Sequence, residues 1–282
     1  MLAQPGPVGG GALGSPHGGS AVVTVAGRRG VPTPILILVG ILVVAVVAWW
    51  FLVRSDAPPA PDLAKAAETA AAAQVSATTM QATTTAVPAT TGAPVADPSG
   101  RWAVDPDIGS FQDFTSTWVG YRIDEELGKG IGATTAVGRT PLVTGTVEVS
   151  NGVAVSAEVT ADLRGLQSDR IYRDGKVFEV LHVDRHPEAV FVLAAPVPLT
   201  AGATEMSATV PGVLTVNGVS VAVEAALEVT LVGDILTVVG TLPVVLADHN
   251  VVAPSASIVI SVADRGVVEF QLFLIRAVGG TG

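Results

Sequence analysis

The chain has 282 residues, and its 25 Asp and Glu against 15 Lys and Arg give a formal net charge of −10. It contains no cysteine, which excludes disulfide bonds and thiolate metal sites. The acidic surplus lies in residues 100–282, and an acidic domain repels nucleic acid, so we expect no nucleic-acid partner.

The first predicted element is an uninterrupted apolar run at residues 35–53, preceded by a Gly- and Pro-rich stretch at residues 1–34. A helix of this length spans roughly the 30 Å hydrocarbon core of a bilayer. The run is longer than a signal peptide's apolar region of about 7–15 residues, and it ends in Trp49-Trp50-Phe51, which is typical of an interfacial aromatic belt. We predict a disordered cytosolic tail, an uncleaved single-pass helix in the plasma membrane, and an extracytoplasmic domain after it.

Residues 54–99 form a predicted linker. Ala, Thr and Pro make up 29 of the 43 residues from 57 to 99. Residues 63–77 favour a short Ala-rich helix, whereas residues 78–98 contain too few large apolar side chains to form a core. A flexible chain of this length has a root-mean-square span of roughly 35–40 Å, so we predict a spacer between membrane and domain.

Residues 100–278 alternate between apolar and polar side chains almost throughout, which predicts β-strands. Tight-turn pairs separate several of these runs, at Asn151-Gly152, Asn217-Gly218 and Gly233-Asp234. A final apolar run, Gly266 to Ile275, can close the sheet and remove its edge. We predict an all-β fold, an antiparallel lipocalin-like barrel of about eight strands.

The alternation also predicts strand register. In the first hairpin, a three-residue loop at residues 150–152 places Val147 opposite Val155 and gives one apolar face, with Gly152 in the left-handed conformation. A two-residue turn there would mix polar and apolar side chains on both faces. At Asn217-Gly218, by contrast, a two-residue turn already gives an apolar face.

Residues 168–181 break the strand pattern because they are strongly charged. We predict a short helical crossover there, interrupted near Gly175, with Ser168 as its N-cap. The side chains expected to point inward are Ile171, Phe178 and Leu181.

Several of these pieces, in this order, resemble the YceI-like family over residues 101–276. They are Trp102 to Asp105, Ser168-Asp169-Arg170 followed by Phe178, the His186-Pro-Glu-Ala-Val-Phe191 stretch, the Gly212-Val-Leu-Thr-Val-Asn-Gly218 hairpin, and Ala247-Asp-His-Asn250. His186 and His249 stand where that family has aromatic residues. The resemblance implies a lipocalin-like barrel whose interior takes the long apolar tail of a polyisoprenoid lipid.

The candidate site follows from that resemblance and from the inward positions of the strands. Aromatic and small apolar side chains either pack the core or contact a lipid, and a charge cluster on the crossover is either a solvated face or a gate. The candidate lipid contacts are Phe114, Trp118, Tyr121, Val155, Ala157, Phe178, Phe191 and Leu214. The candidate gate residues are Asp169, Arg170, His186 and Asn250.

We expect neither a metal site nor catalysis. His182, Asp184 and His186 alternate as ligands on one strand would, but Pro187 interrupts such a strand and no fourth ligand is evident. No catalytic or phosphate-binding motif is present in the sequence.

These observations leave three candidate functions. The first is a membrane-anchored, non-enzymatic carrier that holds an isoprenoid or quinone-like lipid and needs no other cofactor. The second is a stalked structural or interaction ectodomain with a filled barrel and no ligand. The third is a hydrolase or isomerase on the same scaffold. A hollow interior separates the first from the second.

Overall fold

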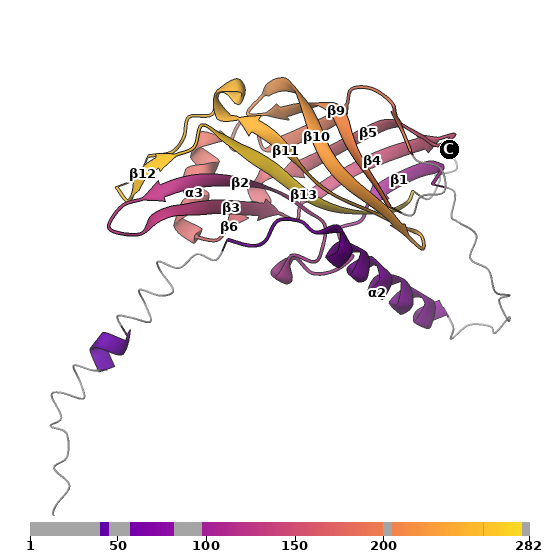
Figure 1. Cartoon of the computed structure of the whole chain (residues 1–282), viewed down its shortest axis with the longest axis horizontal. Coiled ribbons are helices and arrows are strands. Elements are labelled where there is room, and N and C mark those ends of the chain that lie inside the picture. Colours follow the sequence, from indigo (N-terminus) through magenta and orange to yellow (C-terminus); the bar gives the residue numbers. More distant parts are fainter. Residues whose placement is uncertain (1–39, 45–56, 82–97, 200–204, 256, 278–282) are drawn as a thin grey trace, which may run out of the picture. The chain divides into compact units, whose positions relative to one another are not determined.

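The computed structural model describes most of the second half of the chain and parts of the first (Figure 1). Its contacts divide the chain into two units, residues 1–50 and 51–282, and the second unit contains the sheet. The described residues are 40–44, 57–81, 98–199, 205–255 and 257–277.

The predicted tail at residues 1–34 and most of the predicted membrane segment at residues 35–53 lie outside the described residues. Residues 40–44, the described part of that segment, are helical. Within the described ranges, no helix has both the length and the apolar character needed to cross a membrane.

Eight antiparallel strands close into a barrel, which confirms the predicted architecture (Figure 1). The ring closes because β1 pairs on one side with β4 and on the other with β13. In order around the barrel the strands are β1 (Gly100–Val104), β4 (Val143–Ser150), β5 (Val153–Asp162), β7 (Glu188–Leu193), β9 (Glu205–Val216), β10 (Val219–Val232), β11 (Ile235–Val245) and β13 (Arg265–Arg276).

Further strands extend the sheet beyond the ring. β2 pairs with β13 along residues 267–271, on the same edge that β1 occupies from residue 274 onward. The additional strands are β2 (Trp118–Leu127), β3 (Gly132–Thr140) and β6 (Gln167–Ser168) in sequence across the sheet, with β12 (Val259–Val262) on β2 and β8 (Val197–Pro198) on β5.

Strand β10 shows why these sequences form a barrel wall. Glu224 and Glu228 are exposed, while Ala225 between them is buried and Leu227 and Val229 are partly buried. This alternation gives each strand one face for solvent and one for the interior. The predicted two-residue turns join β9 to β10 and β10 to β11. Paired across them are Val216 with Val219, Leu214 with Val221, and Val232 with Ile235.

The first hairpin corrects the predicted register. Residues 151–152 form a two-residue turn, although Gly152 is left-handed as predicted, with φ of 73°. A β-bulge then shifts the pairing, so that Val147 lies opposite Ala157 rather than Val155. The predicted three-residue loop is wrong because the extra residue that aligns the apolar faces sits inside the strand, not in the turn.

The crossover is a continuous helix, α3 (Ile171–Val180), so the interruption predicted at Gly175 is wrong. A glycine costs a helix only about 1 kcal/mol, and Val177 is buried in a cluster with Leu163 and Leu166 that offsets this cost. The N-cap is Arg170 rather than Ser168.

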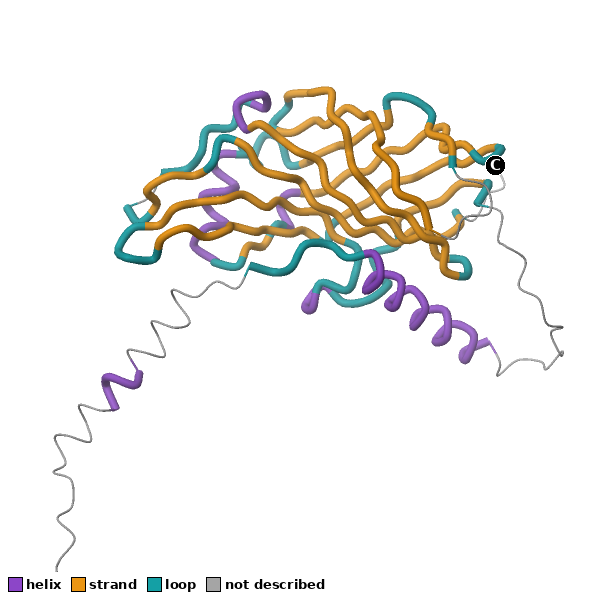
Figure 2. Tube along the Cα trace, in the orientation of Figure 1, coloured by secondary structure: helices purple, strands orange, loops and turns teal. Residues whose placement is uncertain are grey.

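The segment predicted as a free linker contains helix α2 (Leu63–Gln81), which packs on the outside of the barrel (Figure 2). Its Ala66 and Ala70 are buried in one cluster with Ile235, Val239 and Phe273. Alanine favours helix, and its small side chain lets the helix lie close to the sheet. The prediction that residues 54–99 are a spacer is therefore wrong for residues 63–73, which belong to the folded unit.

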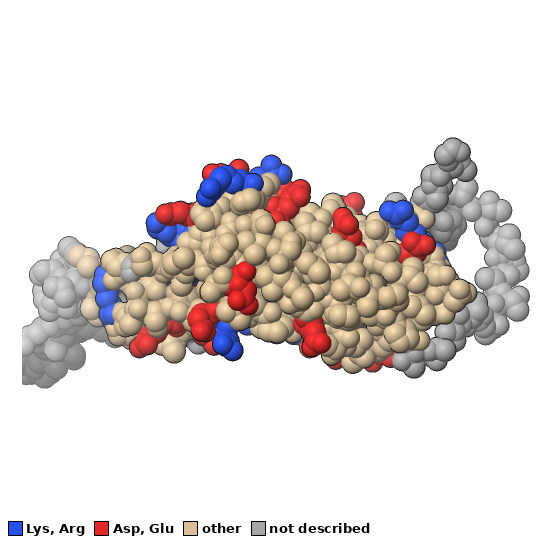
Figure 3. All heavy atoms as spheres, turned by 90° about the horizontal axis from the view of Figure 1, so that it is seen from above, with Lys and Arg blue, Asp and Glu red and all other residues tan. Residues whose placement is uncertain are grey.

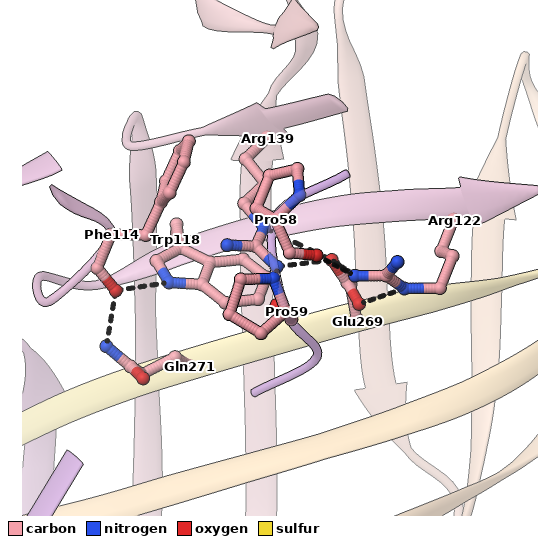
Figure 4. Close-up of polar contacts among 8 residues, drawn as sticks. All are labelled: Pro58, Pro59, Phe114, Trp118, Arg122, Arg139, Glu269 and Gln271. Atoms are coloured by element: carbon pink, nitrogen blue, oxygen red, sulfur yellow. Dashed lines mark hydrogen bonds and ion pairs between the residues drawn. The ribbon is translucent and has the colours of Figure 1, made fainter. Parts of the chain in front are cut away.

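A charged cluster lies under the residues just before α2 (Figure 4). We call Arg122, Arg139 and Glu269 the Glu269 cluster. The Glu269 carboxylate is fully buried and accepts hydrogen bonds from Arg139 Nη2 at 2.7 Å and Arg122 Nε at 3.0 Å. The same two arginines donate to the carbonyls of Pro58 at 2.5 Å and Pro59 at 2.6 Å. Thus the cluster fixes the N-terminal segment to β2, β3 and β13.

Stacking completes the environment of Arg139. Its guanidinium lies 3.7 Å from the centre of the Trp118 ring and 4.6 Å from that of Phe114. Gln271 of β13 donates to the carbonyls of residues 114–116, which holds the Phe114 loop against the same strand. Burial lowers the pKa of the Arg139 guanidinium, and the Glu269 carboxylate opposes that shift.

Charged side chains are scattered over the face drawn in Figure 3, with acidic and basic groups interspersed. No wide patch of one sign occupies that face.

The docking of α2 can be tested with Ala70→Asp. A carboxylate at this fully buried position cannot be solvated while the helix stays docked, so we expect the free energy of unfolding to fall by about 1–3 kcal/mol. Ala71→Asp, one residue along on the exposed face, is the matched control and should have little effect. Equal effects of the two variants in urea unfolding would contradict the docked helix.

The Glu269 cluster predicts a strong effect of Glu269→Gln. Removal of this charge leaves two guanidinium groups, one of them fully buried, without their carboxylate partner. We expect a loss of about 3 kcal/mol in the free energy of unfolding, measured by denaturant titration with tryptophan fluorescence. Glu228→Gln, on the exposed face of β10, is the control. A loss below about 1 kcal/mol at Glu269 would show that the cluster behaves as a surface ion pair.

Candidate functional site

The barrel is hollow. A cavity of about 400 Å³ lies inside it, within the range of about 300–1,000 Å³ typical of ligand pockets. Its wall is built from the inward faces of the barrel strands, of β2 and of α3. Typical wall residues are Val147, Val159, Leu227, Val229, Phe270 and Leu272.

Small side chains on the inward positions explain why the space is empty. β5 contributes three alanines to the wall, Ala154, Ala157 and Ala161, while β7 contributes Ala189 and β10 contributes Ala225. An eight-stranded barrel with larger residues at such positions fills its own interior. Here the alanines leave room for a ligand of apolar character.

One end of the cavity is formed by α3 and carries the charged groups. Val177, Val180 and Leu181 present apolar surface there. The Arg173 guanidinium pairs with the carboxylates of Glu125 and Asp169. This end therefore carries paired charges next to apolar side chains.

Four of the eight candidate lipid contacts line the cavity, namely Tyr121, Ala157, Phe191 and Leu214. They come from β2, β5, β7 and β9, so the fold brings together residues that are far apart in the sequence. Leu181, expected to point inward, also lines the cavity, whereas the side chain of Ile171 lies outside the described part of the structure.

The other four candidates lie elsewhere. The bulge in β5 turns Val155 outward, where it is 40% exposed. Phe178 is not on the cavity wall and packs against the cluster of Leu163, Leu166, Val177 and Val183. Phe114 and Trp118 lie on the outer face of the sheet against Arg139, because the alternation along β2 points Trp118 away from the interior when Tyr121 points into it.

The candidate gate residues are not one group. Arg170 is buried, lines the cavity and lies 3.8 Å from the Asp169 carboxylate. His186 instead packs its ring over Gly218, in the turn between β9 and β10. Asn250 ends a short 3-10 helix (Leu246–His249) in a left-handed conformation and is not on the cavity wall. Of the four candidates, only Arg170 is on the cavity wall.

Sequence reasoning missed a polar cluster around Asn217. The Asn217 amide Oδ1 lies 2.9 Å from His182 Nδ1, and its Nδ2 donates to the carbonyls of His249 at 3.1 Å and Asn250 at 3.3 Å. His249 is itself buried and lines the cavity. The sequence does contain the parts of this cluster, an Asn-Gly turn and an Asp-His-Asn stretch. No local pattern shows that the two lie side by side.

The three residues considered as metal ligands do not share a strand. Residues 181–185 form turns after α3, and His182 has a φ of 49°. In the described part of the chain, no group of three or more His, Cys, Asp or Glu side chains is arranged to hold a metal ion.

A family model for the YceI-like domain matches residues 102–274, more than half of the chain. The chain belongs to the YceI-like family. The match runs from the first barrel strand into the last, so the YceI-like domain coincides with the closed ring and its cavity. No curated protein matches the chain.

Solved structures to which the chain is similar include proteins from three bacteria. BcnA of Burkholderia cenocepacia is 23% identical with a TM-score of 0.45, over 55% of this chain and 95% of its own. A polyisoprenoid-binding domain from Saccharophagus degradans, implicated in plant cell wall breakdown, is 15% identical with a TM-score of 0.46, over 62% of this chain and 98% of its own. The Campylobacter jejuni YCEI protein is 12% identical with a TM-score of 0.42, over 50% and 85%.

The close fit between Phe191 and Gly212 predicts the effect of Gly212→Ala. A Cβ at residue 212 would lie 2.2 Å from the Phe191 ring, so the ring must move from its place in the YceI-like cavity wall. We expect a loss of about 1–3 kcal/mol in the free energy of unfolding. Gly175→Ala, where a Cβ meets nothing within 4 Å on α3, should instead stabilise by about 0.5–1 kcal/mol. The opposite order of the two variants in thermal melting would contradict this packing.

Proposed function

We propose that the protein is a non-enzymatic binding protein that holds an isoprenoid or quinone-like lipid tail inside the barrel. The observation that carries the proposal is the cavity of about 400 Å³ with a predominantly apolar wall. Transfer of each buried CH₂ group from water into such a wall is favourable by about 0.8 kcal/mol. Affinity for a long tail then requires no chemistry from the protein.

Membership of the YceI-like family points to the same class of ligand. The filled barrel of a purely structural module would have larger inward side chains in place of Ala154, Ala157 and Ala161. The hollow interior therefore favours a carrier over a stalked interaction domain.

We further propose that the apolar run at residues 35–53 anchors the carrier in the plasma membrane, with the barrel on the extracytoplasmic side. Two features of the run support this: its length and the Trp49-Trp50-Phe51 belt at its end. The proposed ligand supports it too, because isoprenoid lipids reside in bilayers. An anchored barrel would remain within reach of its ligand.

Ala157→Phe tests the carrier function. Ala157 is inward on β5, opposite Val147, so a phenyl ring there occupies the space that the tail needs. We expect the full-length protein, purified in mild detergent, to yield an isoprenoid-type lipid on solvent extraction and mass spectrometry. The variant should yield at least about tenfold less lipid while it unfolds cooperatively at a similar temperature.

Val155→Phe supplies the matched control, because it adds the same ring to the same strand outside the cavity. Its lipid content should equal that of the unaltered protein. An unaltered protein that carries no such lipid, even after incubation with polyprenol, would exclude the carrier function.

A further inference from the structure

The two most exposed large apolar side chains of the barrel domain lie on one short segment. Among the described residues from 98 to 277, Val252 is 79% exposed and Ile260 is 65% exposed, and the next is Leu142 at 50%. We call the described residues 251–255 and 257–262, which contain Val252 and Ile260, the lip. Apolar side chains that are exposed together, rather than scattered singly, mark contact surfaces.

The lip also lacks charge. No Asp, Glu, Lys or Arg occurs from residue 250 to residue 263, although Asp248 and Asp264 stand on either side of this stretch. The outward positions of a strand with one solvated face are normally polar, as Glu224 is on β10. On β12 the exposed position is Ile260 instead. The lip therefore has the composition of a surface that meets an apolar medium.

The lip is part of the cavity wall. Its side chains that line the cavity are Val251, Pro254, Ile258, Val259 and Val262. The exposed Val252 and Ile260 each follow directly after one of these residues in the chain. At the lip, therefore, a single stretch of chain separates the cavity from the surroundings. In Figure 1, β12 lies at the same end of the barrel as α3.

Hydrogen bonds fix the lip at both ends. The Leu246 N–H donates to the Asp264 carbonyl at 3.0 Å, and the Val251 N–H donates to the Leu246 carbonyl at 3.0 Å. β12 pairs with β2, and just beyond β2 the Gly128 N–H donates to the Ile258 carbonyl at 2.7 Å. The fold itself therefore holds the apolar side chains of the lip in their exposed positions.

A lipid bilayer fits this surface better than a protein partner does. A stable protein interface buries roughly 800 Å² on each partner, whereas two side chains on a narrow segment offer far less. A bilayer needs no matching surface and takes up apolar side chains at the boundary between head groups and acyl chains. The absence of charge removes the desolvation cost that would oppose this insertion. The continuity of the lip with the cavity wall points the same way, because the proposed ligand resides in bilayers.

We propose that the lip inserts Val252 and Ile260 into the surface of a lipid bilayer, so that the barrel meets the membrane with the end that carries β12. This inference rests on the proposed membrane-anchored carrier and adds the surface through which the barrel contacts the bilayer. The cavity wall at the lip then lies against the acyl chains. A lipid tail has a path there between bilayer and cavity that avoids bulk water.

Site-specific fluorescence tests the contact, because a chain without cysteine takes a thiol-reactive label only at an introduced position. In Ser257→Cys, at an exposed position of the lip, the thiol carries a nitrobenzoxadiazole group. The full-length protein is reconstituted in phosphatidylcholine vesicles, with or without a lipid that bears a doxyl quencher on its acyl chain. We expect the quencher to remove most of the fluorescence. Val252→Asn and Ile260→Asn together should restore most of it, because the lip then leaves the bilayer.

Val192→Asn is the matched control, because it removes an exposed apolar side chain from β7, outside the lip. It should leave the quenching as in the protein with an unaltered lip. Equal quenching with and without the two lip substitutions would overturn the inference, as would no quenching in protein that floats with the vesicles. Emission at short wavelength without quenching would show that a protein surface covers the lip, and would overturn it too.

The same experiment separates this inference from the proposed function. Both lip positions are exposed, so the doubly substituted protein should melt at a temperature similar to that of the unaltered protein. Quenching at the lip of a protein that yields no isoprenoid-type lipid on extraction would support the bilayer contact and exclude the carrier function. Protein that fails to float with the vesicles would overturn the anchor and the bilayer contact together.

Discussion

The middle of strand β13, residues 269–274, has both of its faces largely buried, and the barrel interior and the layer that contains α2 meet there. Its inward residues Val268, Phe270, Leu272 and Leu274 line the cavity. Its outward residues are also buried: Glu269 in its charged cluster, and Phe273 beneath α2. A barrel strand normally presents one face to solvent. Here the segment from Pro58 through α2 takes the place of that solvent, so the N-terminal segment and the barrel depend on the same strand.

In a small β-barrel, the same interior usually has to bury the apolar core and enclose any cavity. Here the two are in different places. Because the outer face of β13 contributes a second apolar core with α2, the interior does not have to supply all of the buried apolar surface. The inward positions can then carry alanines and enclose an empty volume. Packing density inside proteins is normally close to that of crystals, so a cavity of this size requires compensation from elsewhere in the fold.

The contact of Pro58 and Pro59 with Arg122 and Arg139 fixes the chain just before α2 to the sheet. These carbonyls begin only a few residues after the apolar run at 35–53. Both prolines belong to the segment for which composition alone suggested a long spacer.

The sequence by itself determined the class of fold, because the signals involved are local. Period-two alternation, the Asn217-Gly218 and Gly233-Asp234 turns and the final apolar run each act over a few residues, and together they predicted an antiparallel barrel of about eight strands. The YceI-like family was implied separately, by the resemblance of several short motifs. Half of the candidate lipid contacts followed from the same alternation. The errors at Trp118 and Val155 came from what alternation cannot show, namely which face of a strand is covered and where a bulge shifts the register.

Only the tertiary structure decided the rest. Arg139 meets Pro59 across 80 positions of sequence and Glu269 across 130, and no local pattern encodes such contacts. Whether the alanines of β5 leave a hollow depends on the strands opposite them, and whether α2 is a spacer or a wall depends on the face of β11 and β13 that it covers. Among the described residues, the Tyr121 hydroxyl is buried without a hydrogen-bond partner. Only the tertiary structure decides this, because it depends on which polar groups of distant segments the packed interior brings near.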